Sequence, residues 1–266
     1  MTGAAAPGSL DHVVVNVLRR MDEAADLFAA LGFRLTPRGH HSLGSINHLM
    51  MVPGAYLELV GLPETGPQRQ ELKDSPFGLN GLVVASGDAD TTRARLAGAG
   101  FEVGSPVAFS RPVALDGGEA EARFRTVRLP AGLFPAGRVY HCEHLTPDLV
   151  WRPEWFAHPN GFTGLDGVTV ESPTPEAEAR LYAAACGATA EPGEGGWRIP
   201  LGDASVTVVP GPHGRFAALT LRFADLDGIE ARARALPEAE WIRRGPGAGA
   251  LTLPAFGLHL RCEATS

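Results

Sequence analysis

One strand-and-helix pattern occurs four times along the 266-residue chain, and this repetition constrains the fold more than any other feature. Each copy opens with a short apolar strand and continues into a stretch with helical apolar spacing that ends at glycine or proline. From one fixed position in the strand to the end of the helix the interval is 20, 19, 20 and 19 residues. The pairs that bound these intervals are His12 and Gly32, Gly81 and Gly100, Gly167 and Gly187, and Ala218 and Pro237. The chain is therefore predicted to contain an internal structural repeat.

The first copy shows the whole unit. The spacing predicts a strand over 10–17, a helix over 21–31, and further strands over 33–36, 45–52 and 55–60. This order is βαβββ in about 50 residues. Four such units predict an α+β fold in which the units pair into two halves.

The domain organisation follows from this pairing. We expect residues 1–145 to form the first paired-unit domain and residues 163–266 a second, degenerate one. The connecting segment, residues 146–162, contains prolines and aromatic residues, which predict an ordered strap rather than a flexible linker.

Composition limits the classes of partner. A net charge of -7 and no basic run longer than two residues argue against nucleic acid or an anionic membrane. No apolar stretch approaches the roughly 20 residues of a membrane span, and the first residues do not resemble a signal peptide. The three cysteines are widely separated and suit reduced, buried thiols: Cys142, Cys186 and Cys262. We therefore expect a cytoplasmic, bacterial-type protein, monomeric or homodimeric, that binds a small molecule.

Several catalytic signatures are missing from the chain. It contains no nucleophile elbow, P-loop, dinucleotide fingerprint or HExxH motif. Hydrolase, kinase and dinucleotide-dependent functions are thereby disfavoured, and no nucleotide cofactor is expected.

The opening strand has two different faces. One face is wholly apolar, whereas the other carries an imidazole and an amide: Val13, Val15 and Val17 form the first, and His12, Val14 and Asn16 the second. A buried polar group is costly unless something uses it, so His12 is either a hydrogen-bonded core residue or part of a site. The three sister strands place glycine or alanine at this position, which favours the site.

Several segments resemble a known family. The residues are Leu10-Asp11-His12, the run 41–47, Tyr56-Leu57-Glu58-Leu59, the run 144–151, and His158-Pro159-Asn160-Gly161. They are similar to the bacterial glyoxalase-like domain subgroup of the vicinal-oxygen-chelate superfamily, which includes glyoxalase I, fosfomycin-resistance proteins and extradiol dioxygenases. The resemblance implies paired βαβββ modules with cup-shaped mixed sheets. It covers the first 160 residues, while the second half matches only the repeat pattern.

The resemblance also implies a divalent metal held by the first and last strands of each module. His12 and Glu58 match these positions in the first module, but the first-strand position of the second module is Gly81. Strand alternation in the last strand places His141 and Glu143 on one face, so Glu143 matches the last-strand ligand, with His141 in reserve. Such nitrogen and oxygen ligands suit Zn, Mn, Fe(II), Co or Ni with an open position.

Roles for the other polar residues follow from this interpretation. Glu143 is the predicted catalytic base, because His141 beside it could replace it on the metal. The predicted substrate-binding residues are those on the inner faces, in the loop of the subgroup resemblance and in the strap: Asn16, His41, Asn47, Tyr56 and Trp151.

Two functions remain open at this point. One is a metalloenzyme of lyase, isomerase or dioxygenase type that acts on a small oxygen-rich metabolite in the N-terminal cup. The other is a metal-free protein that sequesters a natural product or antibiotic. Gly81 distinguishes the two functions. Glycine has no side chain to bind a metal, so the metalloenzyme needs another residue in place of the missing ligand. The second half is expected to be mainly structural or to close a hydrophobic substrate space. The polar residues that alternate along its last strand, His259, Arg261 and Glu263, are expected to form a solvated face.

Overall fold

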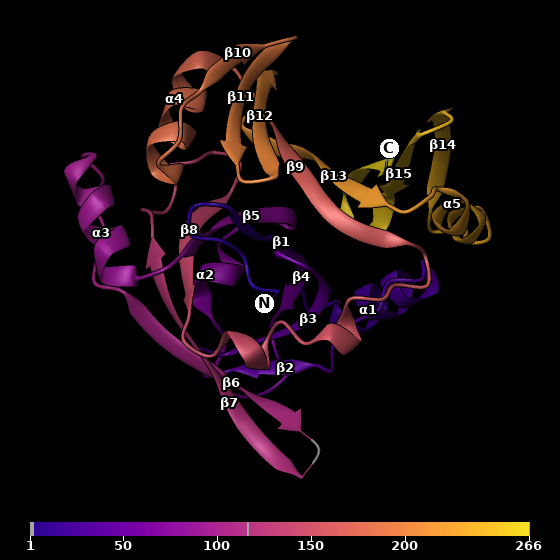
Figure 1. Cartoon of the computed structure of the whole chain (residues 1–266), viewed down its shortest axis with the longest axis horizontal. Helices are drawn as coiled ribbons and strands as arrows, with labels where there is room; N and C mark the ends of the chain where they lie inside the picture. Colours follow the sequence, from indigo (N-terminus) through magenta and orange to yellow (C-terminus); the bar gives the residue numbers. More distant parts are fainter. Residues whose placement is uncertain (1–2, 116, 266) are drawn as a thin grey trace.

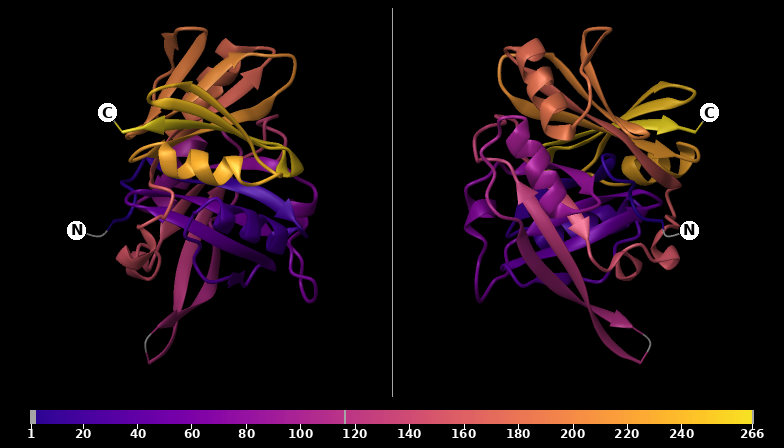
Figure 2. Two further views of the ribbon diagram at one scale, coloured as in Figure 1. Left: turned by 90° about the vertical axis from the view of Figure 1, so that its right-hand side faces the viewer. Right: turned by 60° about the vertical axis from the view of Figure 1, so that its left-hand side comes forward.

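The computed structural model of the chain describes residues 3–115 and 117–265. The protein consists of two similar halves stacked on each other, each built around one mixed sheet (Figures 1 and 2). The elements of the first half are β1 (Leu10–Leu18), α1 (Met21–Ala30), β2 (Gly39–His41), β3 (Ser45–Val52), β4 (Ala55–Gly61), α2 (Gln70–Lys73), β5 (Gly78–Ser86), α3 (Ala89–Gly98), β6 (Val107–Leu115), β7 (Gly118–Arg128) and β8 (Arg138–His144).

The second half repeats this arrangement with shorter connections. Its elements are β9 (Phe162–Ser172), α4 (Pro175–Cys186), β10 (Glu191–Gly193), β11 (Gly196–Leu201), β12 (Ala204–Pro210), β13 (Arg215–Phe223), α5 (Asp227–Arg234), β14 (Glu240–Gly245), β15 (Ala248–Leu253) and β16 (Leu258–Ala264).

The order of strands confirms the predicted repeat. The first sheet runs β2-β3-β4-β1-β5-β8-β7-β6 and the second runs β10-β11-β12-β9-β13-β16-β15-β14. The second order is the first with each number raised by eight. The chain therefore has the α+β fold of four βαβββ units in two pairs.

Strand β1 joins the two units of the first half. It pairs in parallel with β4 of its own unit and antiparallel with β5 of the next. Its apolar face, Val13, Val15 and Val17, belongs to a hydrophobic core that continues into the second half. Its opposite face looks into the first cup, where Val14 packs in a separate cluster. The two predicted faces of this strand are therefore confirmed.

Aromatic rings from both halves meet in the shared core. Phe33 lies edge-on to Phe162 with ring centroids 5.2 Å apart, and Phe134 lies 4.6 Å from Tyr182. This packing explains one wrong prediction. Residues 33–36 are not a strand, because Phe33 turns into the core between the halves, and the short strand β2 begins only at Gly39.

The connecting strap is ordered by buried polar contacts. His158 Nε2 donates to the carbonyl of Met51 at 2.8 Å, and Asn160 Nδ2 donates to the carbonyl of Leu31 at 3.0 Å. Two short 3-10 helices lie within it, at Pro147–Leu149 and Pro153–Trp155. Among the described residues, no helix has the length and apolar character needed to cross a bilayer.

A second polar contact ties β8 to the other half. The carbonyl of Ala185, in the last turn of α4, accepts hydrogen bonds from His141 Nε2 at 3.0 Å and from Arg95 Nη2 at 2.8 Å. A helix end leaves such carbonyls without partners inside the helix, and a cation there is favourable. Burial and the charge of Arg95 lower the pKa of His141 to about 4.

The acid side of the stability profile tests this contact. His141 is neutral when folded, but the unfolded chain binds a proton at this residue below about pH 6.5, so folding loses free energy as pH falls from 6.5 towards 4. Replacing His141 with Gln removes the titration and leaves a donor. Urea denaturation at pH 7 and pH 5 should show a loss about 2 kcal/mol smaller in H141Q than in the parent chain. Equal losses in the two proteins would contradict this assignment.

Candidate functional site

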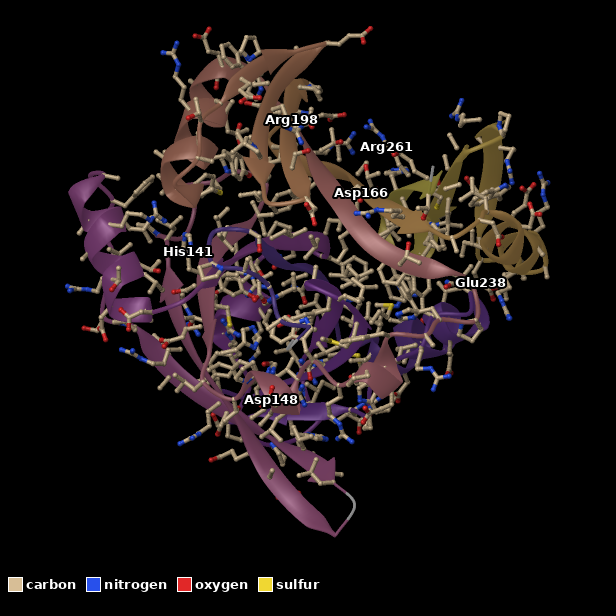
Figure 3. All side chains as sticks on the ribbon, in the orientation of Figure 1. His141, Asp148, Asp166, Arg198, Glu238 and Arg261 are labelled. Atoms are coloured by element: carbon tan, nitrogen blue, oxygen red, sulfur yellow. The ribbon has the colours of Figure 1, made fainter. Side chains whose placement is uncertain are left out.

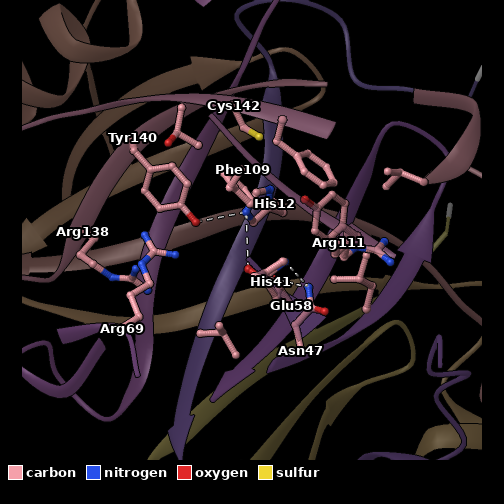
Figure 4. A pocket seen from close by; sticks show the side chains of 16 residues that line it. His12, His41, Asn47, Glu58, Arg69, Phe109, Arg111, Arg138, Tyr140 and Cys142 are labelled. Atoms are coloured by element: carbon pink, nitrogen blue, oxygen red, sulfur yellow. Dashed lines mark hydrogen bonds and ion pairs between the residues drawn. The ribbon is translucent and has the colours of Figure 1, made fainter. Parts of the chain in front are cut away.

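The inner face of the first sheet encloses a polar cavity (Figure 4). Its walls come from β1, β3, β4, β6, β7 and β8, with additions from β2, from the loop before α2 and from the strap. The cavity volume is about 30 Å³. This is room for one or two water molecules, so a larger ligand requires the lining side chains to move.

His12 lies at the centre of this cavity and is oriented by the residue before it. The pairing of β1 with β5 is interrupted between Leu10 and His12, and this bulge lets the side chain of Asp11 reach the neighbouring imidazole. His12 Nδ1 hydrogen-bonds to the Asp11 carboxylate. Nε2 therefore faces the cavity, 3.3 Å from the Tyr140 hydroxyl and 3.7 Å from Glu58 Oε2.

The carboxylate of Asp11 is shared by two histidines. It is fully buried, and its second partner is His144, whose Nε2 lies 3.0 Å from Oδ2. Burial alone would raise the pKa of Asp11, but the charge of His144 and the hydrogen bonds from His12 and His144 hold that pKa well below its usual range. An ionised carboxylate behind an imidazole fixes the ring and its tautomer, as it does behind metal-binding histidines.

A second polar chain positions Glu58. Asn47 Nδ2 donates to Glu58 Oε1 at 2.7 Å, which leaves Oε2 directed at His12. His41 lies beside Asn47, with Nδ1 2.9 Å from the Ser45 hydroxyl. Burial, opposed by the charge of Glu58, lowers the pKa of His41 to about 4, so this imidazole is neutral at pH 7.

The structure brings together five of the residues singled out from the sequence. His12, His41, Asn47, Tyr56 and Glu58 all line the cavity. The Tyr56 ring stacks on the His12 imidazole with centroids 4.3 Å apart and thereby holds the plane of the ring. Their predicted positions agree with the structure, while their roles as ligands or substrate contacts remain predictions.

The predicted placement of His141 and Glu143 in the cup is wrong. His141 lies on the outer side of β8, against the end of α4 (Figure 3). Glu143 shares that side, where Oε2 accepts the backbone N–H of Ala89 at the start of α3 and pairs with Arg125 at 3.3 Å. Because β8 carries polar residues on both faces, alternation alone could not decide which face points inward. Neither residue can reach His12 Nε2 to act as ligand or base.

Asn16 and Trp151 do not line the cavity either. The Asn16 amide donates to the carbonyls of Leu72 at 3.0 Å and Pro76 at 3.2 Å, so it anchors the segment around α2. Trp151 lies behind the wall, with its ring edge-on to Tyr56 and His144. Both residues support the site rather than face a ligand.

Sequence reasoning missed the inward face of β8. Tyr140 and Cys142 line the cavity, as do Arg138 at the start of the strand and two arginines from other segments, Arg69 and Arg111. The repeat itself contained the signal. His12 pairs with Tyr56, two residues before Glu58, and Gly81 pairs with Arg138, two residues before Tyr140. Tyr140 thus occupies in the second unit the position that Glu58 occupies in the first.

The four ligand positions implied by the resemblance are only half filled. His12 Nε2 and Glu58 Oε2 face each other at 3.7 Å. This distance is only slightly longer than the separation of two donor atoms bound to one metal. Gly81 supplies no ligand, and a Cβ there would lie 3.1 Å from the side chain of Val14, so the position is closed by packing. The fourth position holds the Tyr140 phenol, whose pKa is raised by burial. The chain thus offers a divalent ion two ligands at these positions, His12 and Glu58, and the other positions of such an ion would be filled from outside the chain.

A second group of potential ligands lies beside the first. In the part of the chain that the structure describes, Asp11, Cys142 and His144 have donor atoms within 4.8 Å of one another. Burial raises the pKa of the Cys142 thiol well above its usual range. Asp11 already accepts hydrogen bonds from both histidines. The oxygens of Asp11 are thus already engaged by imidazoles, whereas His12 Nε2 and Glu58 Oε2 face the cavity.

The equivalent positions of the second half carry different residues. Gly167 pairs with Ser205 where His12 pairs with Tyr56, so Gly167 takes the place of His12. The alternating polar residues of β16, His259, Arg261 and Glu263, are exposed. This agrees with the expectation that they form a solvated face.

Comparison with known sequences identifies one family. The model of the glyoxalase-like domain family matches residues 10–186, which covers the first half, the strap, β9 and α4. No curated protein sequence matches the chain.

Solved structures share the architecture at low identity. A hypothetical protein from Staphylococcus aureus has a TM-score of 0.69 and 13% identity, covering 96% of this chain and 99% of its own. The Mn(II)-bound glyoxalase from Novosphingobium aromaticivorans has a TM-score of 0.62 and 13% identity, covering 97% of this chain and 82% of its own. Homoprotocatechuate 2,3-dioxygenase from Arthrobacter globiformis has a TM-score of 0.58 and 14% identity, covering 98% and 81%. At these identities the likeness concerns the fold.

Removing the shared carboxylate tests the architecture of the site. Asp11→Ala leaves two buried imidazoles without their common acceptor, and breaking a buried pair in this way costs about 3–5 kcal/mol. Chemical denaturation at pH 7 measures the loss. The exposed Asp22, which pairs with Arg38 at the surface, is the control, and D22A should cost less than about 1 kcal/mol. Similar losses for D11A and D22A would show that the Asp11 network contributes little.

Proposed function

This chain belongs to the glyoxalase-like domain family of the vicinal-oxygen-chelate superfamily, and from this membership we propose that it is an enzyme acting on a small oxygen-rich metabolite in the N-terminal cup. The observation that carries the proposal is the buried pair of His12 Nε2 and Glu58 Oε2, held 3.7 Å apart by Asp11 and Asn47 and facing the cavity. Burying an imidazole and a carboxylate side by side costs free energy that partners or a ligand must offset.

His12 and Glu58 are the residues that would hold a divalent metal, of which Zn, Mn, Fe(II), Co and Ni suit the donors. When bound, the metal supplies Lewis-acid polarisation of a carbonyl or enolate oxygen. Since the chain fills only part of the shell, two neighbouring oxygens of the metabolite would complete it once the lining side chains move to admit the metabolite. This favours a substrate such as a hydroxy ketone, a catechol or an adduct of an oxoaldehyde.

The residues around the pair position the substrate. The Tyr140 hydroxyl, 3.3 Å from His12 Nε2, is placed to donate a hydrogen bond to a substrate oxygen. The imidazole of His41 and the ring of Tyr56 also line the cavity, and Phe109 and Phe124, stacked 5.0 Å apart, supply apolar surface to it. These contacts favour lyase or isomerase chemistry on a planar enediol-like group.

Metal titration tests the ligand assignment. The chelator-treated protein is titrated calorimetrically with Mn(II) and with Zn(II), and one site per chain is expected. His12→Ala and Glu58→Gln should each weaken binding more than about 100-fold, because each removes one of two ligands. Glu143→Gln, on the outer side of β8, is the matched control and should bind as the parent chain does. Stoichiometric binding that is lost in C142A rather than in E58Q would assign the metal to Asp11, Cys142 and His144 instead.

A turnover experiment tests the enzymatic part. The metal-loaded protein is incubated with catechols, hydroxy ketones and hemithioacetals, and products are followed by mass spectrometry and oxygen uptake. Turnover that disappears in E58Q and persists in E143Q supports the proposal. A metal-loaded protein without turnover on any of these compounds would oppose it.

A metal-free binding protein is the second candidate, and a specific observation favours it. The second unit offers Gly81 and Tyr140 where the family's metal site needs ligands, so the cup is equipped more fully for hydrogen bonding than for coordination. In that case the parent chain binds neither metal in the titration above. Small-molecule ligands would then be expected to bind equally well in the presence and absence of chelator.

A further inference from the structure

Three arginines converge on one carboxylate beside the cavity. Arg69 donates to Glu71 Oε2 through both Nε, at 3.1 Å, and Nη2, at 2.8 Å. Arg128 Nη1 donates to the same oxygen at 2.9 Å, and Arg138 Nη1 lies 3.8 Å from Oε1. The cluster of Arg69, Arg128 and Arg138 therefore carries three positive charges against the single negative charge of Glu71.

Several N–H donors in this cluster have no hydrogen-bond partner among the described residues. Arg128 Nε and Nη2 and Arg138 Nη2 are buried and make no hydrogen bond in the part of the chain that the structure describes. Burial lowers the pKa of both guanidinium groups, which reflects the cost of keeping them charged there. Since Arg69 already satisfies Glu71, an anion in the adjoining cavity would give the unpaired donors of Arg128 and Arg138 a partner once the side chains that cover them shift.

The cluster lies where two cavities meet. A larger cavity, of about 510 Å³, is lined by Arg128, Arg138 and Tyr140 together with residues of the loop between β7 and β8. Arg138 and Tyr140 also line the cup around His12. The acidic groups that face this region are Glu58 in the cup, Glu71 in the cluster and the exposed Asp74 at the rim of the larger cavity. Arg138 and Tyr140 therefore form a wall shared by the two cavities, and a metabolite in the larger cavity reaches His12 when the Tyr140 side chain moves.

We propose that Arg128 and Arg138 bind a carboxylate or phosphate group of the ligand, so that the protein acts on an anionic metabolite. The guanidinium fork matches the two oxygens of such a group, and a buried pair of forks discriminates strongly against neutral ligands. The acidic group is held in the larger cavity, and the oxygen-rich end reaches the pair of His12 and Glu58. This assignment of substrate class rests on the proposed function of the cup.

Anion binding by the metal-free protein tests the proposal. Chelator-treated protein is titrated calorimetrically at low salt with inorganic phosphate and, separately, with malonate, to distinguish a phosphate site from a carboxylate site. Saturable binding of at least one anion is expected, because a probe that lacks the rest of the metabolite still engages the guanidinium forks. Added salt should weaken it.

Variants locate the binding. Arg138→Gln and Arg128→Gln should each lower the affinity for the anion at least about tenfold, because each removes one guanidinium group that forms charge-assisted hydrogen bonds. Arg138→Lys keeps the positive charge but lacks the two-pronged guanidinium group. Its affinity for the anion should lie between those of R138Q and the parent chain. Arg123→Gln, on the same strand as Arg128 but exposed, is the control and should bind as the parent chain does. Thermal melting of each unliganded variant shows that it is folded.

The outcomes separate this proposal from the metal site. Glu58→Gln removes a proposed metal ligand and an opposing charge, so E58Q should bind phosphate or malonate at least as tightly as the parent chain. Anion binding without metal binding would overturn the metalloenzyme and leave the anion site standing. The anion site would be overturned if neither phosphate nor malonate bound at millimolar concentration. It would also be overturned if R138Q and R123Q lost anion affinity equally, whatever the metal titration shows.

Discussion

The first cup depends on the carboxylate of Asp11. The bulge in β1 places this side chain beside that of His12, so one short stretch delivers a carboxylate and an imidazole together. A fully buried carboxylate would be costly alone, but two imidazoles share it. Because β1 is paired on both edges, with β4 and with β5, the bulge lies at the joint between the two units of the half. The same few residues thus connect the units and direct His12 Nε2 into the cavity.

The fold could be predicted from the sequence largely because it is repeated. A single amphipathic strand and helix is weak information, but four copies with equal spacing exclude most other architectures. The strand predicted over residues 33–36 is absent for a physical reason that the sequence of one unit does not show. Phe33 is apolar like a strand residue, yet its partner is Phe162, which belongs to the other half of the chain. Contacts between repeats decide the path of this segment, and they were not readable from one repeat.

The site was predictable only where a strand has two unlike faces. In β1 one face is wholly apolar, so the polar face had to point towards something else, and His12 was placed correctly. In β8 polar residues occupy both faces, because the outer face meets the carbonyl at the end of α4 while the inner face meets the cavity. The arginines were beyond sequence reasoning for a related reason. Arg69 and Arg111 come from a loop and a distant strand, and their convergence on the cup depends on tertiary packing.

The second half shows which of these features the fold itself requires. Its sheet has the same order of strands as the first, with Gly167 in the place of His12. Within the first half, Gly81 occupies the corresponding place and is packed against Val14. The bulge before this position recurs in the other three units, at Asn80, Asp166 and Ala217, so it belongs to the fold. None of these units follows the bulge with an imidazole or buries a carboxylate there as deeply as Asp11. Only the first unit desolvates a carboxylate and an imidazole, Asp11 and His12, and this costs free energy. What offsets the cost is the group that His12 Nε2 contacts inside the cup.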